Sequence, residues 1–148
     1  MLRIDVTTLI SRPVQEVWDF FSDLTNSPRW TRSGSEVRQT STGPVEVGAT
    51  FESVRQIFGR EIKSQTLVAT EYEPLRLISY VAIIPILGRV IGGYTFDSVD
   101  GGTRMSRWTE AELGRGEGLF GPLAARLFSR AQGAELASLK RLIEARPA

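Results

Sequence analysis

The sequence predicts an α+β domain in which an antiparallel sheet is closed by a long C-terminal helix. Three stretches carry this prediction. Residues 11–30 read as one amphipathic helix followed by a short second helix. Residues 35–113 have the composition of strands interrupted by turns, and residues 122–145 repeat leucine at helical spacing. A sheet cupped around one helix leaves room between them, so we expect a cavity.

The first strand and helix follow from the period of their apolar residues. Residues 2–10 alternate apolar and polar positions, which indicates a strand with one buried face. Pro13 suits the first position of a helix, because its backbone angle is already helical and its missing N–H is not needed there. The helix then carries an apolar stripe at positions i, i+3, i+4 and i+7, formed by Val14, Val17, Trp18 and Phe21.

A second short helix is expected after the first. Asp23 or Thr25 can cap its start, and Pro28 is predicted to end it, because the residue before a proline is pushed out of the helical region. Trp30 would then turn back toward the core.

Turn signals divide the middle of the chain into strands. They predict strands near residues 35–41, 48–58, 60–72, 75–84, 89–98 and 103–113. Parallel neighbours would need long crossovers, so connections this short favour antiparallel hairpins. Asp100 and Gly101 tolerate the positive φ angles of a tight hairpin. Pro122 is predicted to begin the last helix, which Gly133 interrupts.

Composition excludes several kinds of chemistry. The chain has 148 residues, which is the size of one domain, and we expect residues 1–148 to form a single unit. It contains no cysteine and no histidine, so a thiol nucleophile, a disulfide and the commonest general base are all missing. We expect no metal and no cofactor. The net charge of +1 and the scattered basic residues argue against nucleic-acid binding.

The sequence also predicts where the protein works. No stretch approaches the ~20 apolar residues of a transmembrane helix, so we expect no stable membrane insertion. Residues 1–6 alternate in polarity and lack the basic flank and apolar run of a signal peptide. The expected location is therefore cytoplasmic.

Several of these features together resemble the SRPBCC (START-like, helix-grip) superfamily, and most of all its polyketide cyclase/dehydrase and lipid-transport branch. The resemblance covers nearly the whole chain and is carried by Ser11, Pro13, Val17, Trp18, Phe20 or Phe21, Trp30, residues 100–104 and the helix after Gly121-Pro122. It implies a helix-grip fold, with a seven-stranded curved antiparallel sheet around the long C-terminal helix and two short helices after strand 1. Members of this superfamily bind sterols, lipids, hormones or polyketides, and some catalyse cyclisation or dehydration.

The alternation of side chains along a strand predicts which residues line the cavity, because every second side chain lies on the same face. If Phe51 points inward, its strand contributes two polar neighbours, and two later strands and the C-terminal helix complete the set. The predicted ligand-binding residues are Phe51, Ser53, Arg55, Tyr94, Phe96, Met105, Arg107, Thr109, Leu127, Phe128 and Ala131. Ordinary core packing is the alternative for each aromatic residue, and solvent exposure is the alternative for each arginine.

Three functions fit these observations. The first is a binding or carrier protein for a hydrophobic small molecule such as a lipid, a polyketide or an isoprenoid-like compound. The second is a cofactor-independent cyclase or dehydratase that relies on cavity shape, in which Arg107 would stabilise an enolate and Tyr94 or an acid would move protons. The third is a protein-interaction module or homodimer that uses residues 83–91, which are more apolar than a hairpin tip requires.

Overall fold

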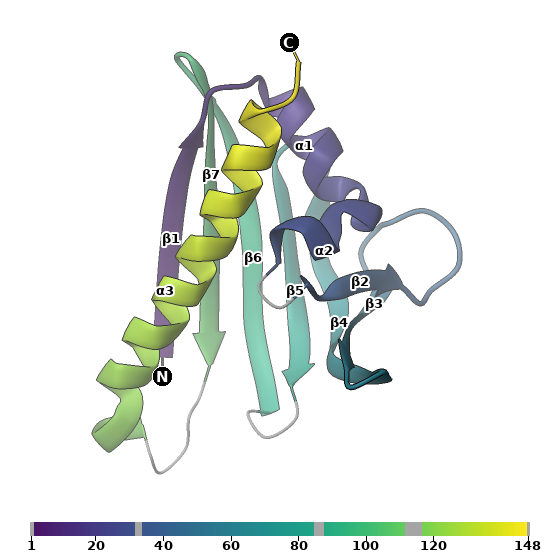
Figure 1. Ribbon diagram of the computed structural model, residues 1–148, viewed down its shortest axis with the longest axis vertical. Coiled ribbons are helices and arrows are strands. Elements are labelled where there is room, and N and C mark those ends of the chain that lie inside the picture. The colour runs from purple at the N-terminus through teal and green to yellow at the C-terminus, as the bar shows by residue number, and fades with distance from the viewer. Residues whose placement is uncertain (1, 32–33, 85–87, 112–116, 148) are drawn as a thin grey trace.

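The protein is described by a computed structural model that covers residues 2–31, 34–84, 88–111 and 117–147 (Figure 1). Within these residues one antiparallel sheet contains seven strands in the order β1-β7-β6-β5-β4-β3-β2. The strands are β1 (Leu2–Ile10), β2 (Glu36–Gln39), β3 (Thr50–Ile57), β4 (Arg60–Glu73), β5 (Leu77–Ile84), β6 (Gly88–Val99) and β7 (Gly102–Ala111). Strands β2 to β7 follow one another as hairpins, and β1 pairs with β7. The predicted fold class is confirmed.

Helices cover one face of this sheet. They are α1 (Val14–Ser22), the short 3-10 turn η1 (Leu24–Asn26), α2 (Ser27–Trp30) and α3 (Glu117–Glu144). Helix α3 has 28 residues, which makes it roughly 42 Å long. It packs along β1 and against α2, and Figure 1 shows α1 and α2 beside its C-terminal half.

Three prolines lie at other helix positions than predicted. Pro13 is the N-cap of α1, which begins at Val14, and not its first helical residue. Pro28 stands in the first turn of α2 instead of ending a helix, because its missing N–H falls among those that an N-terminal turn leaves unpaired. Pro122 lies inside α3 instead of beginning it, since the helix starts at Glu117. A proline so close to the N-terminus removes few intrahelical hydrogen bonds. Asp23 caps the 3-10 turn η1, where its side chain accepts a hydrogen bond from the Thr25 N–H, while the N-cap of α2 is Asn26.

The main hydrophobic core lies where α1 and the C-terminal half of α3 meet the sheet. Val17 of α1, Met105 of β7 and Leu139 of α3 are fully buried there. The Trp18 ring meets the Phe96 ring edge-on at 5.1 Å between centroids. This core closes one end of the sheet and holds α3 in place across it. No helix among the described residues is long and apolar enough to cross a membrane.

The end of α3 is anchored to the junction between β1 and α1. The Glu144 carboxylate accepts hydrogen bonds from the Ser11 backbone N–H at 2.8 Å and from Lys140 Nζ at 2.9 Å. These two bonds, with the larger effect from Ser11, lower the pKa of Glu144 below its usual value of 4.5. Because the folded pKa is below the unfolded one, the carboxylate stabilises the fold fully above pH 4.5. This contribution is lost as the pH falls through the folded pKa.

Replacing Glu144 with glutamine is expected to lower the free energy of unfolding at pH 7 by about 1 kcal/mol. The difference from the wild-type protein should shrink in acid, where the wild-type carboxyl group is itself protonated. Urea unfolding at pH 7 and near pH 3 measures both values. A difference of the same size at both pH values would contradict the assignment.

Candidate functional site

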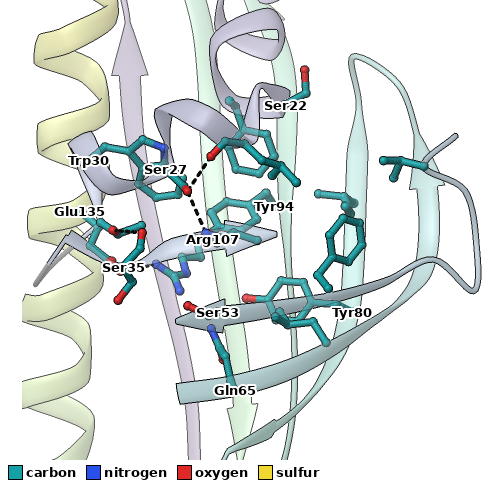
Figure 2. Close-up of a pocket in the computed structure, with 18 of the residues that line it drawn as sticks. Ser22, Ser27, Trp30, Ser35, Ser53, Gln65, Tyr80, Tyr94, Arg107 and Glu135 are labelled. Carbon is teal, nitrogen blue, oxygen red and sulfur yellow. Dashed lines mark hydrogen bonds and ion pairs between the residues drawn. The ribbon is translucent and has the colours of Figure 1, made fainter. Parts of the chain in front are cut away.

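A cavity of about 860 Å³ lies between the sheet and the helices. Its wall combines residues of α1, η1, α2 and α3 with residues of strands β2 to β7 (Figure 2). The volume falls in the range typical of small-molecule sites. The cavity borders the main core on the helix-covered face of the sheet, since Trp18, Trp30 and Tyr94 belong to both.

Aromatic side chains form much of this wall. The helices contribute Trp18, Phe21, Trp30 and Phe128, and the strands contribute Phe51, Tyr72, Tyr80 and Tyr94. The rings contact one another, with Phe21 at 4.8 Å and Trp30 at 6.5 Å from Tyr94 between centroids. Tilted and edge-on arrangements of this kind are the ones that aromatic pairs prefer. This part of the wall is therefore apolar and aromatic.

Polar residues gather on the strands at another part of the wall. Ser53 of β3 is buried and pairs in register with Gln65 of β4, and both line the cavity. The register shifts beside Ser53, so that Ser64 of β4 is an extra residue in the ladder and also lines the cavity. Its hydroxyl donates a hydrogen bond to the Ser53 carbonyl at 3.0 Å. The bulge thus brings two consecutive polar residues of one strand to the same site.

Arg107 of β7 brings a largely buried charge to this wall. Its Nη1 donates to Glu135 Oε1 of α3 at 2.7 Å, and its guanidinium lies 5.1 Å from the Tyr94 ring centroid (Figure 2). Only 15% of the Arg107 side chain and 17% of the Glu135 side chain are exposed. Desolvation lowers the pKa of Arg107, but Tyr94, Tyr80 and Glu135 outweigh it and the net pKa is raised. The guanidinium is therefore a permanent cation in the cavity wall.

Tyr94 has a phenol group that stays protonated. Its burial raises the pKa well above the usual value of 10, and the opposing effect of Arg107 is smaller. The hydroxyl can donate a hydrogen bond to a bound molecule, but it is not a base near neutral pH.

A smaller cavity of about 80 Å³ adjoins the first and shares Arg107 and Phe128 with it. Its polar wall includes Thr109, whose hydroxyl accepts a hydrogen bond from the Gln132 side-chain amide at 2.9 Å. Arg107 therefore stands between the two spaces. Among the described residues, no group of three or more acidic side chains gathers as metal ligands would.

The predicted ligand-binding residues fall into four groups. Six of them line the large cavity: Phe51, Ser53, Arg55, Tyr94, Arg107 and Phe128. Thr109 lines the small cavity, while Phe96 and Met105 are buried in the main core. Leu127 of α3 is 57% exposed and Ala131 is half-buried. Their roles in binding stay predictions.

Other lining residues were not nominated from the sequence. Trp18 and Phe21 were recognised as an apolar stripe, but the stripe alone does not show that one edge of it borders a cavity. Glu135 carries no sequence signal that sets it apart from other charged residues of the helix. Ser64 and Gln65 depend on the bulge, which strand periodicity does not reveal.

The comparison with known families agrees with this arrangement. The family described as polyketide cyclase / dehydrase and lipid transport matches residues 1–144. The chain belongs to this family. The predicted membership of the SRPBCC superfamily, in the polyketide cyclase/dehydrase and lipid-transport branch, is thereby confirmed. The family's description is consistent with binding of hydrophobic small molecules.

Solved structures share the fold at low sequence identity. A protein from Rhodobacter sphaeroides is 16% identical with a TM-score of 0.78, covering 99% of this chain and 94% of its own. Protein MLL2253 from Mesorhizobium loti is 16% identical with a TM-score of 0.75, covering 99% of both chains. Ara h 8.0201 is 10% identical with a TM-score of 0.73, covering 97% of this chain and 98% of its own. No match is found among curated proteins.

Proposed function

We propose that this protein binds or carries a hydrophobic small molecule, of the lipid, polyketide or isoprenoid-like kind, in the cavity between the sheet and α3. The observation that carries the proposal is a cavity of about 860 Å³ with an aromatic wall and a few polar groups. Apolar burial contributes about 25 cal/mol per Å² of surface, so such a wall supplies most of the affinity, and the polar groups orient the ligand.

Two features favour binding over catalysis. The sequence has no histidine and no cysteine. Tyr94 keeps its proton because its pKa is raised by burial. A cyclase or dehydratase in this cavity would rely on cavity shape, on Arg107 to stabilise an enolate, and on Tyr94 or an acid such as Glu135 to move protons. Turnover of a polyketide substrate that is lost in an Arg107→Leu variant would establish that alternative.

A homodimer through residues 83–91 is the remaining alternative. Residues 85–87 lie outside the described part of the chain. At the edges of this segment Ile83 is 53% exposed and Val90 is buried. A change of size-exclusion volume in an Ile83→Asp variant would support the dimer, and a monomer in both proteins would exclude this contact.

Native mass spectrometry of the freshly purified protein tests the proposed function. We expect a population that carries a small hydrophobic molecule, released when the protein is denatured. Titration with Nile red, a neutral hydrophobic dye, independently measures binding to the protein molecules whose cavity holds no co-purified ligand. If no molecule co-purifies and Nile red does not bind, the proposed function is wrong.

Replacing Phe128 with aspartate is expected to weaken Nile red binding about tenfold or more, because a charge would stand in the apolar wall. Phe128 lines both cavities and is 38% exposed, so the fold should survive the change. The matched control is Leu127→Asp on the same helix, where the side chain is 57% exposed. Fluorescence titration should show an unchanged dissociation constant for the control. Equal losses in both variants would remove Phe128 from the site.

A further inference from the structure

Three buried hydrogen-bond donors in the cavity wall have no partner among the described residues. They are Trp30 Nε1, Arg55 Nε and Arg107 Nε, and all three residues line the large cavity. None of these atoms can accept a hydrogen bond. A buried donor without a partner costs about 1–3 kcal/mol. Each of these three atoms is itself shielded from the cavity space, so a ligand would meet other atoms of the same side chains, which for the two arginines are further N–H donors. The two arginines therefore offer hydrogen-bond donors, and no acceptor, to a bound group.

The charges of the wall point the same way. Its described charged residues are Arg55, Arg107 and Glu135, two cations and one carboxylate, which leaves one positive charge. Arg107 and Glu135 form an ion pair, whereas Arg55 makes no ion pair within the described residues. Because a half-buried guanidinium is costly without an anionic or polar partner, the net charge favours an anionic ligand group.

The neighbouring polar residues extend this preference. Arg55 is two residues beyond Ser53 on β3, so both side chains face the same side of that strand. Ser53, Ser64 and Gln65 can add neutral hydrogen bonds to the same group, since all three line the cavity. The aromatic residues of the helices leave the rest of the cavity apolar. A ligand that matches both the polar and the aromatic part of the wall is acidic at one end and flat or apolar at the other.

We infer that the ligand is a hydrophobic acid whose anionic oxygen group binds to Arg55 and Arg107, while its apolar body packs against the aromatic wall. A carboxylate and an acidic enol or phenol share this chemistry. The inference rests on the proposed function and names the ligand class of the same cavity.

The test compares 1-pyrenebutyric acid with its methyl ester, which keeps the apolar body and removes the charge. The wild-type protein is expected to bind the acid at least tenfold more tightly than the ester, because charge-assisted hydrogen bonds exceed neutral ones. Arg55→Gln should weaken binding of the acid about tenfold and leave binding of the ester within twofold. The control Arg104→Gln changes an exposed arginine on the strand that carries Arg107 and should change neither value.

Arg107 needs a compensated variant, because removing it alone leaves the Glu135 carboxylate buried without its partner. The double variant Arg107→Gln/Glu135→Gln keeps the site neutral and should weaken the acid selectively, as Arg55→Gln does. An acid and an ester that bind equally well to the wild-type protein overturn the inference and leave the proposed function standing. Equal losses of both probes in Arg55→Gln also overturn it. If neither probe binds, the proposed function fails with it.

Discussion

Replacing Gly102 with alanine is expected to destabilise the protein by about 3 kcal/mol. A Cβ atom at this position would lie 2.0 Å from the Ile10 carbonyl oxygen and 3.1 Å from the Arg12 nitrogen. Ile10 ends β1 and pairs with Thr103 of β7, so its carbonyl cannot move away without disturbing the ladder that joins these strands. Gly102 also has a φ of 156°, which side chains rarely adopt.

The neighbouring glycine provides the matched control. Gly101 has a φ of 84°, and a Cβ atom there would meet nothing within 4 Å. Gly101→Ala should therefore cost only the backbone strain of about 1 kcal/mol. Urea unfolding of the wild-type protein, Gly102→Ala and Gly101→Ala gives the three free energies of unfolding. Their differences separate the cost of the steric clash from the cost of backbone strain. Equal losses at the two positions would show that the approach of β1 to Gly102 is not what limits this turn.

Most of the fold could be predicted because its signals are local. Residues 2–10 alternate in polarity and form β1 with those bounds. Turn residues separate strands whose short connections allow only antiparallel pairing, and the sheet has that topology. The start of α3 could not be placed in this way. Pro122 is compatible with either the first turn or a position slightly further in, and the sequence does not distinguish them.

The cavity lining was harder to predict, because strand parity determines the face of a residue but not its place along the sheet. Tyr94 and Phe96 share a face of β6, yet Tyr94 borders the cavity while Phe96 lies under Trp18 of α1 in the core. Arg107 and Met105 differ in the same way on β7. Where the helices cover the sheet is set by long-range packing, which a single strand does not encode.

Replacing Ser53 with tryptophan is expected to have the largest effect on binding. Ser53 is buried with 3% of its surface exposed and faces the cavity from β3, among the polar residues of the wall. An indole ring that projects from there into the cavity of about 860 Å³ would occupy space that the ligand needs. Nile red should bind at least tenfold more weakly, a loss of about 1.4 kcal/mol. The free energy of unfolding is expected to fall by about 1–3 kcal/mol, because Ser53 is closely packed and its neighbours must move to admit the ring.

Ser106→Trp separates loss of space from a general effect of the larger side chain. Ser106 lies between Met105 and Arg107 on β7 and therefore faces the opposite side of the sheet. Its hydroxyl is 3.1 Å from the Thr7 hydroxyl on β1. This variant should bind Nile red with the wild-type dissociation constant in the same titration. If Ser53→Trp binds the dye as well as the control does, hydrophobic molecules bind elsewhere, and the polar residues around Ser53 are not part of the site.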